Sequence, residues 1–443
     1  MARHVTTLSR TATSLRVAAA TAALALLAFA SVPATAQDFT TLKGHGGPVM
    51  GLAVSPAGRV ASASFDNSVG LWQGREPTWL EAHDAAVVDV IFPSDGVIAS
   101  GGDDFAVRLW QDGAPRLLGR HKGKVTDLAL SPDGQTIASA SWDGTVALWP
   151  LSGGQARWLT ELGGGVNDVA FAPDGRHLYA ATSAGDLLLF DLTRDDPPRA
   201  LSQNGFGINE IVLAPDGSWL AYGMVNGTTW VIDPLTGDKL RDFAVERKPV
   251  LAMAHHAATG QLAIGYGDGY IITIDTNAWR LSKGFQAMRD GPAWALAWTP
   301  DGEMIWAGGI DNVIYGWPVA LFGKVEPPDS ASRSFLRDAA SMPNGERQFM
   351  RKCSICHALE PGESRKAGPT LYGIFGREAG TLPGYRYSET LLAANIVWTE
   401  DTIDALFDQG PDHFIPRSKM PMQRITRAED RDDLIAFLKR ATE

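Results

Sequence analysis

Short runs in which apolar and polar residues alternate fill the chain from Gly44 to Trp317. Alternation with a period of two is typical of β-strands that bury one face. Val125–Leu130 and Thr136–Ala140 are two such runs, and Ser131–Gly134 between them has the composition of a tight turn. Related turns stand at Ala172–Gly175, Ala214–Gly217 and Thr299–Gly302. The pattern predicts an all-β region built of antiparallel hairpins.

These hairpins recur at a regular spacing. Four copies end on a Trp that follows an Asp by six residues, namely Trp72, Trp110, Trp149 and Trp317. Weaker copies end at Phe190, Ile232 and Ile274, and consecutive copies are 38 to 43 residues apart. A period near 40 with four short strands in each unit predicts a β-propeller, and seven copies predict seven blades.

The repeats resemble the WD-repeat family, through the Gly-His pair at 44–45 and the terminal tryptophans. In that family a His, a turn Asp and the Trp form a buried hydrogen-bonded set within a blade. The resemblance covers Gln37 to Phe322 and implies that a spare strand, Asp38 to Leu42, completes the last blade and closes the ring. The implied sets are His45/Asp66/Trp72, His83/Asp104/Trp110 and His121/Asp143/Trp149.

After Pro327–Ser332, whose composition is that of a linker, the apolar period becomes helical. We expect amphipathic helices over Gly345–Ser354 and Arg431–Thr442. The first of them leads into Cys-Ser-Ile-Cys-His at 353–357.

Cys353 and Cys356 are the only cysteines of the chain, and His357 follows them directly. This pattern is typical of a c-type haem attachment site, in which both thiols bond to the haem and the imidazole ligates the iron. Two alternatives are a redox-active cysteine pair, which needs a thioredoxin-like context, and half of a zinc site, which needs two more soft ligands.

The C-terminal region resembles the class I cytochromes c, particularly their mitochondrial-like branch. Gly368–Arg377 matches the family's loop after the haem site, and Phe414–Met420 matches the segment that supplies the sixth ligand. The resemblance implies one covalent haem c whose iron is ligated by His357 and Met420. It also implies a hydrogen bond from His357 to the Pro369 carbonyl, which would fix the imidazole's tautomer.

By the same resemblance, Arg377, Tyr387 and Trp398 fall where the family holds the haem propionates. Met422 is the nearby competitor for the sixth ligand, and it stands where the family has an aromatic residue. Arg417 replaces a glycine of the family. We expect five basic residues to ring the exposed haem edge: Arg351, Lys352, Arg417, Lys419 and Arg424.

Residues 1–36 have the features of a secretory signal peptide. Arg3, Arg10 and Arg16 precede the apolar stretch Val17 to Ala30, and Ala34-Thr35-Ala36 is a small-residue cleavage site. An uncleaved anchor is the alternative. The sequence therefore predicts export to the periplasm as a soluble protein, with no stable membrane insertion after cleavage.

The net charge of −11 is unevenly distributed. From Ser341 onward fourteen Lys and Arg nearly balance fifteen Asp and Glu, so the acidity lies in the propeller region. Such a surface argues against nucleic acid and anionic lipid as partners. The linker is long enough for a basic haem edge to fold back onto this acidic region.

We therefore expect a signal peptide (1–36), an all-β seven-bladed propeller (37–322), a linker (323–340) and an all-α class I cytochrome c domain (341–443). His/Met ligation fills both axial positions of the iron, which favours electron transport over catalysis. The expected function is a periplasmic single-haem electron carrier in a respiratory or oxidative chain. Its redox partners would dock at the haem edge, and the propeller would be a protein-docking platform.

Two other functions stay open. Propeller–cytochrome fusions also occur in redox enzymes of the quinoprotein and nitrite-reductase types, and a haem-based redox sensor or scaffold is conceivable. The adjacent His255 and His256 are the one histidine pair that could ligate a group on the propeller axis. We favour packing at the surface or at a strand end for both.

Overall fold

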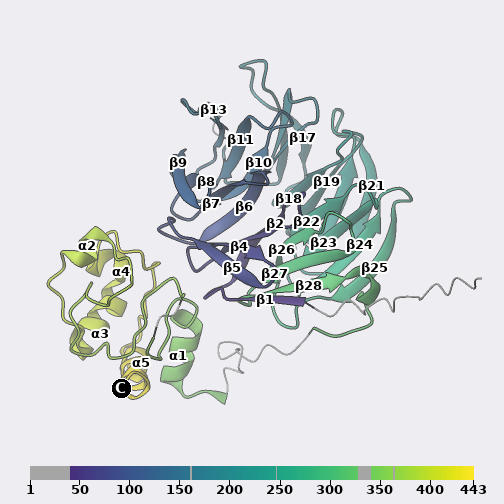
Figure 1. Cartoon of the computed structure of the whole chain (residues 1–443). Helices are drawn as coiled ribbons and strands as arrows, with labels where there is room; N and C mark the ends of the chain where they lie inside the picture. Colours follow the sequence, from purple (N-terminus) through teal and green to yellow (C-terminus); the bar gives the residue numbers. More distant parts are fainter. Residues whose placement is uncertain (1–39, 160–161, 246, 328–340, 363–364) are drawn as a thin grey trace, which may run out of the picture. The chain divides into compact units, whose positions relative to one another are not determined.

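A computed structural model of the chain describes residues 40–159, 162–245, 247–327, 341–362 and 365–443. The predicted signal peptide and most of the predicted linker lie outside these ranges. The described N-terminal region forms seven four-stranded sheets, in which consecutive strands pair antiparallel (Figure 1). The first strand of each sheet packs against the first strand of the next, so these strands line the centre of a seven-bladed β-propeller. The predicted fold is confirmed.

The strands of the seven blades follow one another in sequence. Blade one holds β2 (Val49–Val54), β3 (Val60–Ser64), β4 (Val69–Gln73) and β5 (Glu76–Leu80). Blade two holds β6 (Val87–Ser94), β7 (Val97–Gly102), β8 (Ala106–Gln111) and β9 (Ala114–Arg120). Blade three holds β10 (Val125–Leu130), β11 (Thr136–Ser141), β12 (Val146–Pro150) and β13 (Arg157–Leu159). Blade four holds β14 (Val166–Phe171), β15 (His177–Thr182), β16 (Asp186–Asp191) and β17 (Arg199–Gln203).

Blade five holds β18 (Ile208–Leu213), β19 (Leu220–Met224), β20 (Thr228–Ile232) and β21 (Lys239–Ala244). Blade six holds β22 (Val250–His256), β23 (Gln261–Tyr266), β24 (Tyr270–Asp275) and β25 (Arg280–Gln286). Blade seven holds β26 (Ala293–Trp298), β27 (Met304–Gly309) and β28 (Val313–Pro318) together with β1 (Thr40–Lys43), and the 3-10 helix η1 (Val319–Leu321) follows it.

The two ends of the repeat region meet in blade seven. Strand β1 pairs antiparallel with β28, with Thr40 opposite Gly316 and Lys43 opposite Val313; in Figure 1 the purple β1 lies beside the green β28. The side-chain amide of Asn312 also donates to the His45 carbonyl oxygen at 2.9 Å. The predicted ring closure is confirmed for Thr40–Lys43, and Asp38, the predicted start of the strand, lies outside the described residues.

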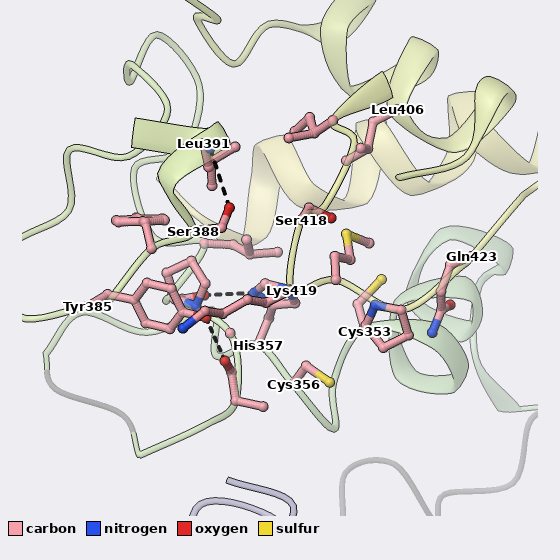
Figure 2. Close-up of a pocket in the computed structure, with 18 of the residues that line it drawn as sticks. Cys353, Cys356, His357, Tyr385, Ser388, Leu391, Leu406, Ser418, Lys419 and Gln423 are labelled. Carbon is pink, nitrogen blue, oxygen red and sulfur yellow. Dashed lines mark hydrogen bonds between the residues drawn. The ribbon is translucent and has the colours of Figure 1, made fainter. Parts of the chain in front are cut away.

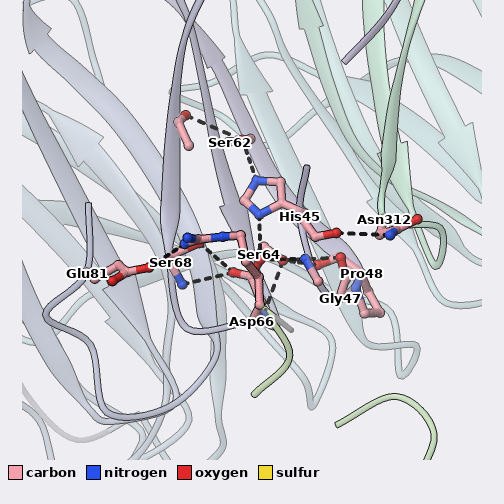
Figure 3. Close-up of polar contacts among 12 residues, drawn as sticks. His45, Gly47, Pro48, Ser62, Ser64, Asp66, Ser68, Glu81 and Asn312 are labelled. Atoms are coloured by element: carbon pink, nitrogen blue, oxygen red, sulfur yellow. Dashed lines mark hydrogen bonds and ion pairs between the residues drawn. The ribbon is translucent and has the colours of Figure 1, made fainter. Parts of the chain in front are cut away.

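The three predicted His/Asp/Trp sets are present, and each contains a serine that the sequence did not reveal. His45 Nδ1 lies 2.9 Å from Asp66 Oδ2, and His45 Nε2 lies 2.7 Å from Ser62 Oγ (Figure 3). Trp72 Nε1 donates to the same hydroxyl at 2.8 Å. Burial alone would raise the pKa of Asp66, but the hydrogen bond and charge of His45, together with hydrogen bonds from Ser68 and the Gly46 N–H, hold that pKa below its usual value.

The same network recurs in blades two and three, where Ser100 and Ser139 take the place of Ser62. In blade three, His121 Nδ1 is closer to Thr145 Oγ1, at 3.0 Å, than to Asp143 Oδ2, at 3.4 Å. The serine hydroxyl links the histidine of one loop to the tryptophan of a neighbouring strand, and it leaves no buried donor of that pair unsatisfied. These residues stabilise the blades.

The histidine pair of blade six lies at the end of β22. His256 Nδ1 contacts Thr259 Oγ1 at 2.8 Å, and its Nε2 lies 3.1 Å from the Pro300 carbonyl oxygen. The His255 ring packs edge-on against Trp219. Both side chains therefore pack at a strand end.

The C-terminal region is helical. Its helices are α1 (Asn344–Lys352), α2 (Glu389–Leu392), α3 (Glu400–Gln409), α4 (Pro411–Phe414) and α5 (Ala428–Ala441). Helices α1 and α5 cross closely, since a Cβ on Gly345 would lie 2.0 Å from the Asp433 carbonyl oxygen, and only glycine permits this approach. None of the helices within the described ranges has the length and apolar character needed to cross a bilayer.

Helix α3 was not among the predicted helices. Its buried face is Ile403, Leu406 and Phe407, and it joins the core formed by α1 and α5. The guanidinium of Arg431 on α5 bonds to Asp404 of α3 at 2.7 Å. The cytochrome-type core therefore needs three helices, of which the two terminal ones were predicted.

Four carboxyl groups link the inner strands of neighbouring blades. Asp89 Oδ2 accepts the Leu128 backbone N–H at 3.0 Å, and Asp127 Oδ2 accepts that of Val169 at 3.0 Å. Asp168 Oδ2 accepts the Ile211 N–H at 2.7 Å. The fourth group, Glu210, accepts a backbone N–H of the next blade in the same way.

Burial of these groups raises their pKa values, to about 6 for Asp89 and well above the usual range for Asp127, Asp168 and Glu210. The negative charges of Asp168 and Asp89 raise the pKa of Asp127 further. Burial therefore favours the protonated, neutral forms of these carboxyl groups in the folded chain.

Raised pKa values make the free energy of unfolding fall as the pH rises from about 4 through 6 and above, because the unfolded chain releases protons that the folded chain retains. Asp127→Asn should make this fall shallower, by up to about 1.4 kcal/mol per pH unit for one proton, because the amide keeps both an acceptor and a donor without ionising. Urea denaturation followed at several pH values measures it. Asp112→Asn, at an exposed hairpin turn, is the control, and parallel pH profiles for Asp127→Asn and the wild type would contradict the account.

Candidate functional site

The two cysteines and His357 are set by the end of helix α1. The Cys353 N–H bonds to the Phe349 carbonyl at 2.8 Å, and the next turn brings the His357 N–H to the Cys353 carbonyl, also at 2.8 Å. Cys356 closes a tighter turn on Cys353, with an N–H to carbonyl distance of 3.0 Å. These turns place two free thiols and one imidazole beside a single cavity (Figure 2).

The cavity is mainly apolar on the cytochrome side. Its lining there includes Leu371, Ile374, Leu391, Trp398, Ile403, Leu406, Phe407, Ile415 and Leu438. Helix α3 supplies three of these residues, so the helix that the sequence analysis missed forms one wall of the site. An apolar lining excludes water from a flat, hydrophobic ligand.

The imidazole of His357 is held in one orientation. Its Nδ1 lies 2.7 Å from the Pro369 carbonyl oxygen, which is the contact that the loop resemblance implies. Because a carbonyl only accepts, Nδ1 carries the proton and Nε2 is left as a metal ligand. Burial lowers the pKa of His357 and keeps the ring neutral. A Cβ on residue 368 would lie 2.4 Å from the ring, so only glycine fits at that position.

The thiols are also held as neutral groups by burial, which raises the pKa of Cys353 to about 12 and that of Cys356 above its usual value. A low-pKa thiolate is typical of redox-active cysteine pairs. This environment instead suits thiols that are consumed in forming permanent bonds.

The segment after α4 brings Met420 into the cavity lining. Met422 is 55% exposed and is not among the residues that line the cavity. Arg417 has a φ of 63°, the left-handed conformation that explains why the family uses glycine at this position. The side-chain arrangement therefore favours Met420 over its competitor.

Three polar or amphipathic residues named in the sequence analysis line the same cavity: Arg377, Tyr387 and Trp398. Arg377 donates to the carbonyl oxygens of Thr370, at 2.9 Å, and Tyr372, at 3.0 Å, which fixes its guanidinium. Burial lowers its pKa, and burial raises that of Tyr387. The site residues of the prediction thus gather around one cavity, although they come from segments up to 67 residues apart.

Three further residues of the site were missed. Tyr385 donates to the Ala367 carbonyl at 2.7 Å, and Lys366 Nζ bonds to the carbonyl of Ser354 inside the cysteine loop. Ser418 lies next to the Met segment, and its buried Oγ has no hydrogen-bond partner within the described residues. The motif match to Phe414–Met420 was the available signal for Ser418, while nothing in the sequence singled out Lys366.

Two of the five residues expected to ring the haem edge line the cavity itself. Lys352 and Lys419 line the cavity, whereas Arg351, Arg417 and Arg424 are not among the lining residues. Arg424 turns its Nε to the Asp408 carbonyl oxygen at 2.7 Å. A backbone acceptor at the end of α3 therefore fixes the position of this side chain.

These residues fit a covalently bound haem. Two thiols, an oriented imidazole and a thioether surround an apolar cavity, and the unpartnered Ser418 hydroxyl is a free donor for a polar group placed inside it. The fold and the site together define a c-type cytochrome domain joined to a propeller.

Comparison with known proteins agrees with this class. The family described as "Cytochrome c" matches residues 343–442, and "WD domain, G-beta repeat" matches 37–73, 75–111, 115–150 and 159–191. Cytochrome c of Sesamum indicum is 42% identical over 100 residues, which are 22% of this chain and 88% of the relative. Cytochrome c of Chlamydomonas reinhardtii is 39% identical over 104 residues (24% and 92%), and that of Arabidopsis thaliana 38% over 98 residues (22% and 87%).

The chain therefore belongs to the cytochrome c family through its C-terminal domain, and its N-terminal region is a WD-repeat propeller. Membership implies a covalently bound haem c at Cys353 and Cys356. The alternatives of a redox-active cysteine pair and of a zinc site are set aside by this match.

Met420→Ala should remove the weak sulfur-to-iron absorption of the oxidised protein and allow cyanide to bind quickly, because the variant leaves an axial position of the iron open. Met422→Ala is the matched control and should keep both properties of the wild type. Absorption spectra of the two oxidised variants, with and without cyanide, measure this. If Met422→Ala has the effect and Met420→Ala does not, the assignment of the sixth ligand is wrong by two residues.

Proposed function

We propose that this protein is an exported single-haem electron carrier, in which His357 and Met420 ligate the haem iron. Haem c, when bound, supplies a one-electron oxidation and reduction. The observation that carries the proposal is that His357 and Met420 both line one apolar cavity, together with the two thiols. With two protein ligands on the iron no position is left for a substrate, so electron transfer is the favoured chemistry.

The remaining cavity residues have supporting tasks in this proposal. The Pro369 carbonyl holds the proton of His357 on Nδ1, so that Nε2 would be free to ligate the iron. Arg377, Tyr387 and Trp398 would hold the haem propionates. The apolar side chains of α3 exclude water, which limits the reorganisation of solvent when the charge of the iron changes.

Export to the periplasm is part of the proposal. It is supported by the charged, apolar and small-residue regions of positions 1–36, and by both cysteines lying in the haem motif. A role in a respiratory or oxidative chain follows from a carrier in that compartment. The propeller would serve as a docking platform for protein partners, as its repeat architecture offers a broad rigid surface.

The test is the cofactor content of the purified full-length protein. A pyridine haemochrome assay against protein concentration should give one haem per chain, with the narrow reduced α-band of c-type haem and no second chromophore. Mass spectrometry of the same sample should place the haem on the peptide containing Cys353 and Cys356 and the mature N-terminus at Gln37. A ratio near two, or a quinone or d-type haem signal, would replace this proposal by the redox-enzyme alternative.

A further inference from the structure

Three basic residues of the cytochrome domain, of which Lys419 lines the haem cavity, contact blades one and two. Arg365 stacks its guanidinium over the Trp79 ring, 4.0 Å from the ring centroid, and forms an ion pair with Glu81. Lys419 Nζ lies 3.0 Å from Asp84 Oδ1. Arg386 donates to the His83 carbonyl oxygen at 2.6 Å. The contact therefore consists of ion pairs, one cation–π pair and a charged hydrogen bond to the backbone.

The backbones approach as closely as the side chains. A Cβ on Gly46 would lie 2.1 Å from the Arg365 carbonyl oxygen and 2.7 Å from the Lys366 nitrogen. All three of its nearest neighbours belong to residues 365–366, and none belongs to the propeller itself. A side chain at position 46 would therefore first displace the backbone of residues 365–366 and so separate the two surfaces.

The propeller loops also complete the wall of the haem cavity. Phe65, Asn67, Asp84, Ala85, Ala86 and Asp103 line the same cavity as Cys356, His357 and Met420. These residues lie in the loop between β5 and β6 and in the turns after β3 and β7. The side of the cavity rimmed by Lys419 is thus covered by blades one and two.

We propose that blades one and two are the docking surface of the chain's own cytochrome domain, and that this contact covers the haem edge against large redox partners. The effect on redox partners rests on the proposed function. The contact between the cytochrome domain and blades one and two does not depend on that function. The tether keeps the two surfaces at an effective concentration on the order of millimolar, so a modest contact is well populated. Its charged pairs are partly exposed, hence high salt weakens the contact.

The contact itself is tested by zero-length coupling with a water-soluble carbodiimide in the full-length holoprotein. Lys419 and Asp84 are within hydrogen-bond distance and should yield an intramolecular cross-linked peptide, identified by mass spectrometry. Gly46→Leu should abolish this peptide. Gly96→Leu is the matched control, because a Cβ there has no atom within 4 Å, and it should keep the peptide.

The covering of the haem edge is tested by the rate of haem reduction by reduced flavodoxin, an acidic one-electron donor. At low salt Gly46→Leu should be reduced about tenfold faster than the wild type and Gly96→Leu, and the difference should shrink at high salt. Asp84→Lys, compared with Asp112→Lys, is a second variant that acts through charge and should also be faster. Ascorbate, which is small enough to reach the edge in either state, should reduce all variants at equal rates.

A wild type without the Lys419–Asp84 peptide would overturn the docking, and equal flavodoxin rates for Gly46→Leu and Gly96→Leu would overturn the covering. Failure of the proposed function is distinguishable from both. It would appear as a chain without reducible haem, whereas the cross-link requires no redox activity.

Discussion

The antiparallel pairing of β1 with β28 is the constraint on which the described fold depends. A propeller of seven sheets stays closed only if its first and last blades are joined, and this chain joins them with four residue pairs from its N-terminal strand. Closure brings the loop that carries Gly46 and His45 to the junction of blades seven and one, where Asn312 also bonds to the His45 carbonyl. Strand β28 ends at Pro318, beyond the Thr40–Gly316 pair, so the chain leaves the ring at the opposite end of this strand from the loop that follows Lys43.

Short-range patterns explain most of what could be predicted. The alternation of the strands and the six-residue spacing from Asp66 to Trp72 are local, so the sequence predicts seven blades and their buried sets. The serines that connect each histidine to its tryptophan, such as Ser62, were not predictable, because a small polar residue in a strand has no periodic signal. Likewise, the carboxyl contacts of Asp127 and Asp168 arise between blades, and only the assembled ring reveals them.

In the haem site, too, the residues within a local motif were predictable and the contacts between distant segments were not. Cys353, Cys356 and His357 lie in one turn, so a sequence motif identifies them, and the loops that hold Pro369 and Met420 are recognisable by their resemblance to a known family. Helix α3 was missed although it lines the cavity, since ten residues with a narrow apolar face give a weak pattern. The backbone partner of Arg424 was not predictable, because charge alone does not reveal which carbonyl a long side chain reaches.

A potentiometric titration of the full-length protein, followed by its visible spectrum, tests the central claim that one His/Met-ligated haem carries single electrons. The account predicts one reversible component that includes all of the haem, with a slope of about 59 mV per tenfold change in the oxidised-to-reduced ratio. The reduced protein should not bind carbon monoxide, since both axial positions are filled. Two components, a slope of about 30 mV, or rapid carbon monoxide binding would contradict the account.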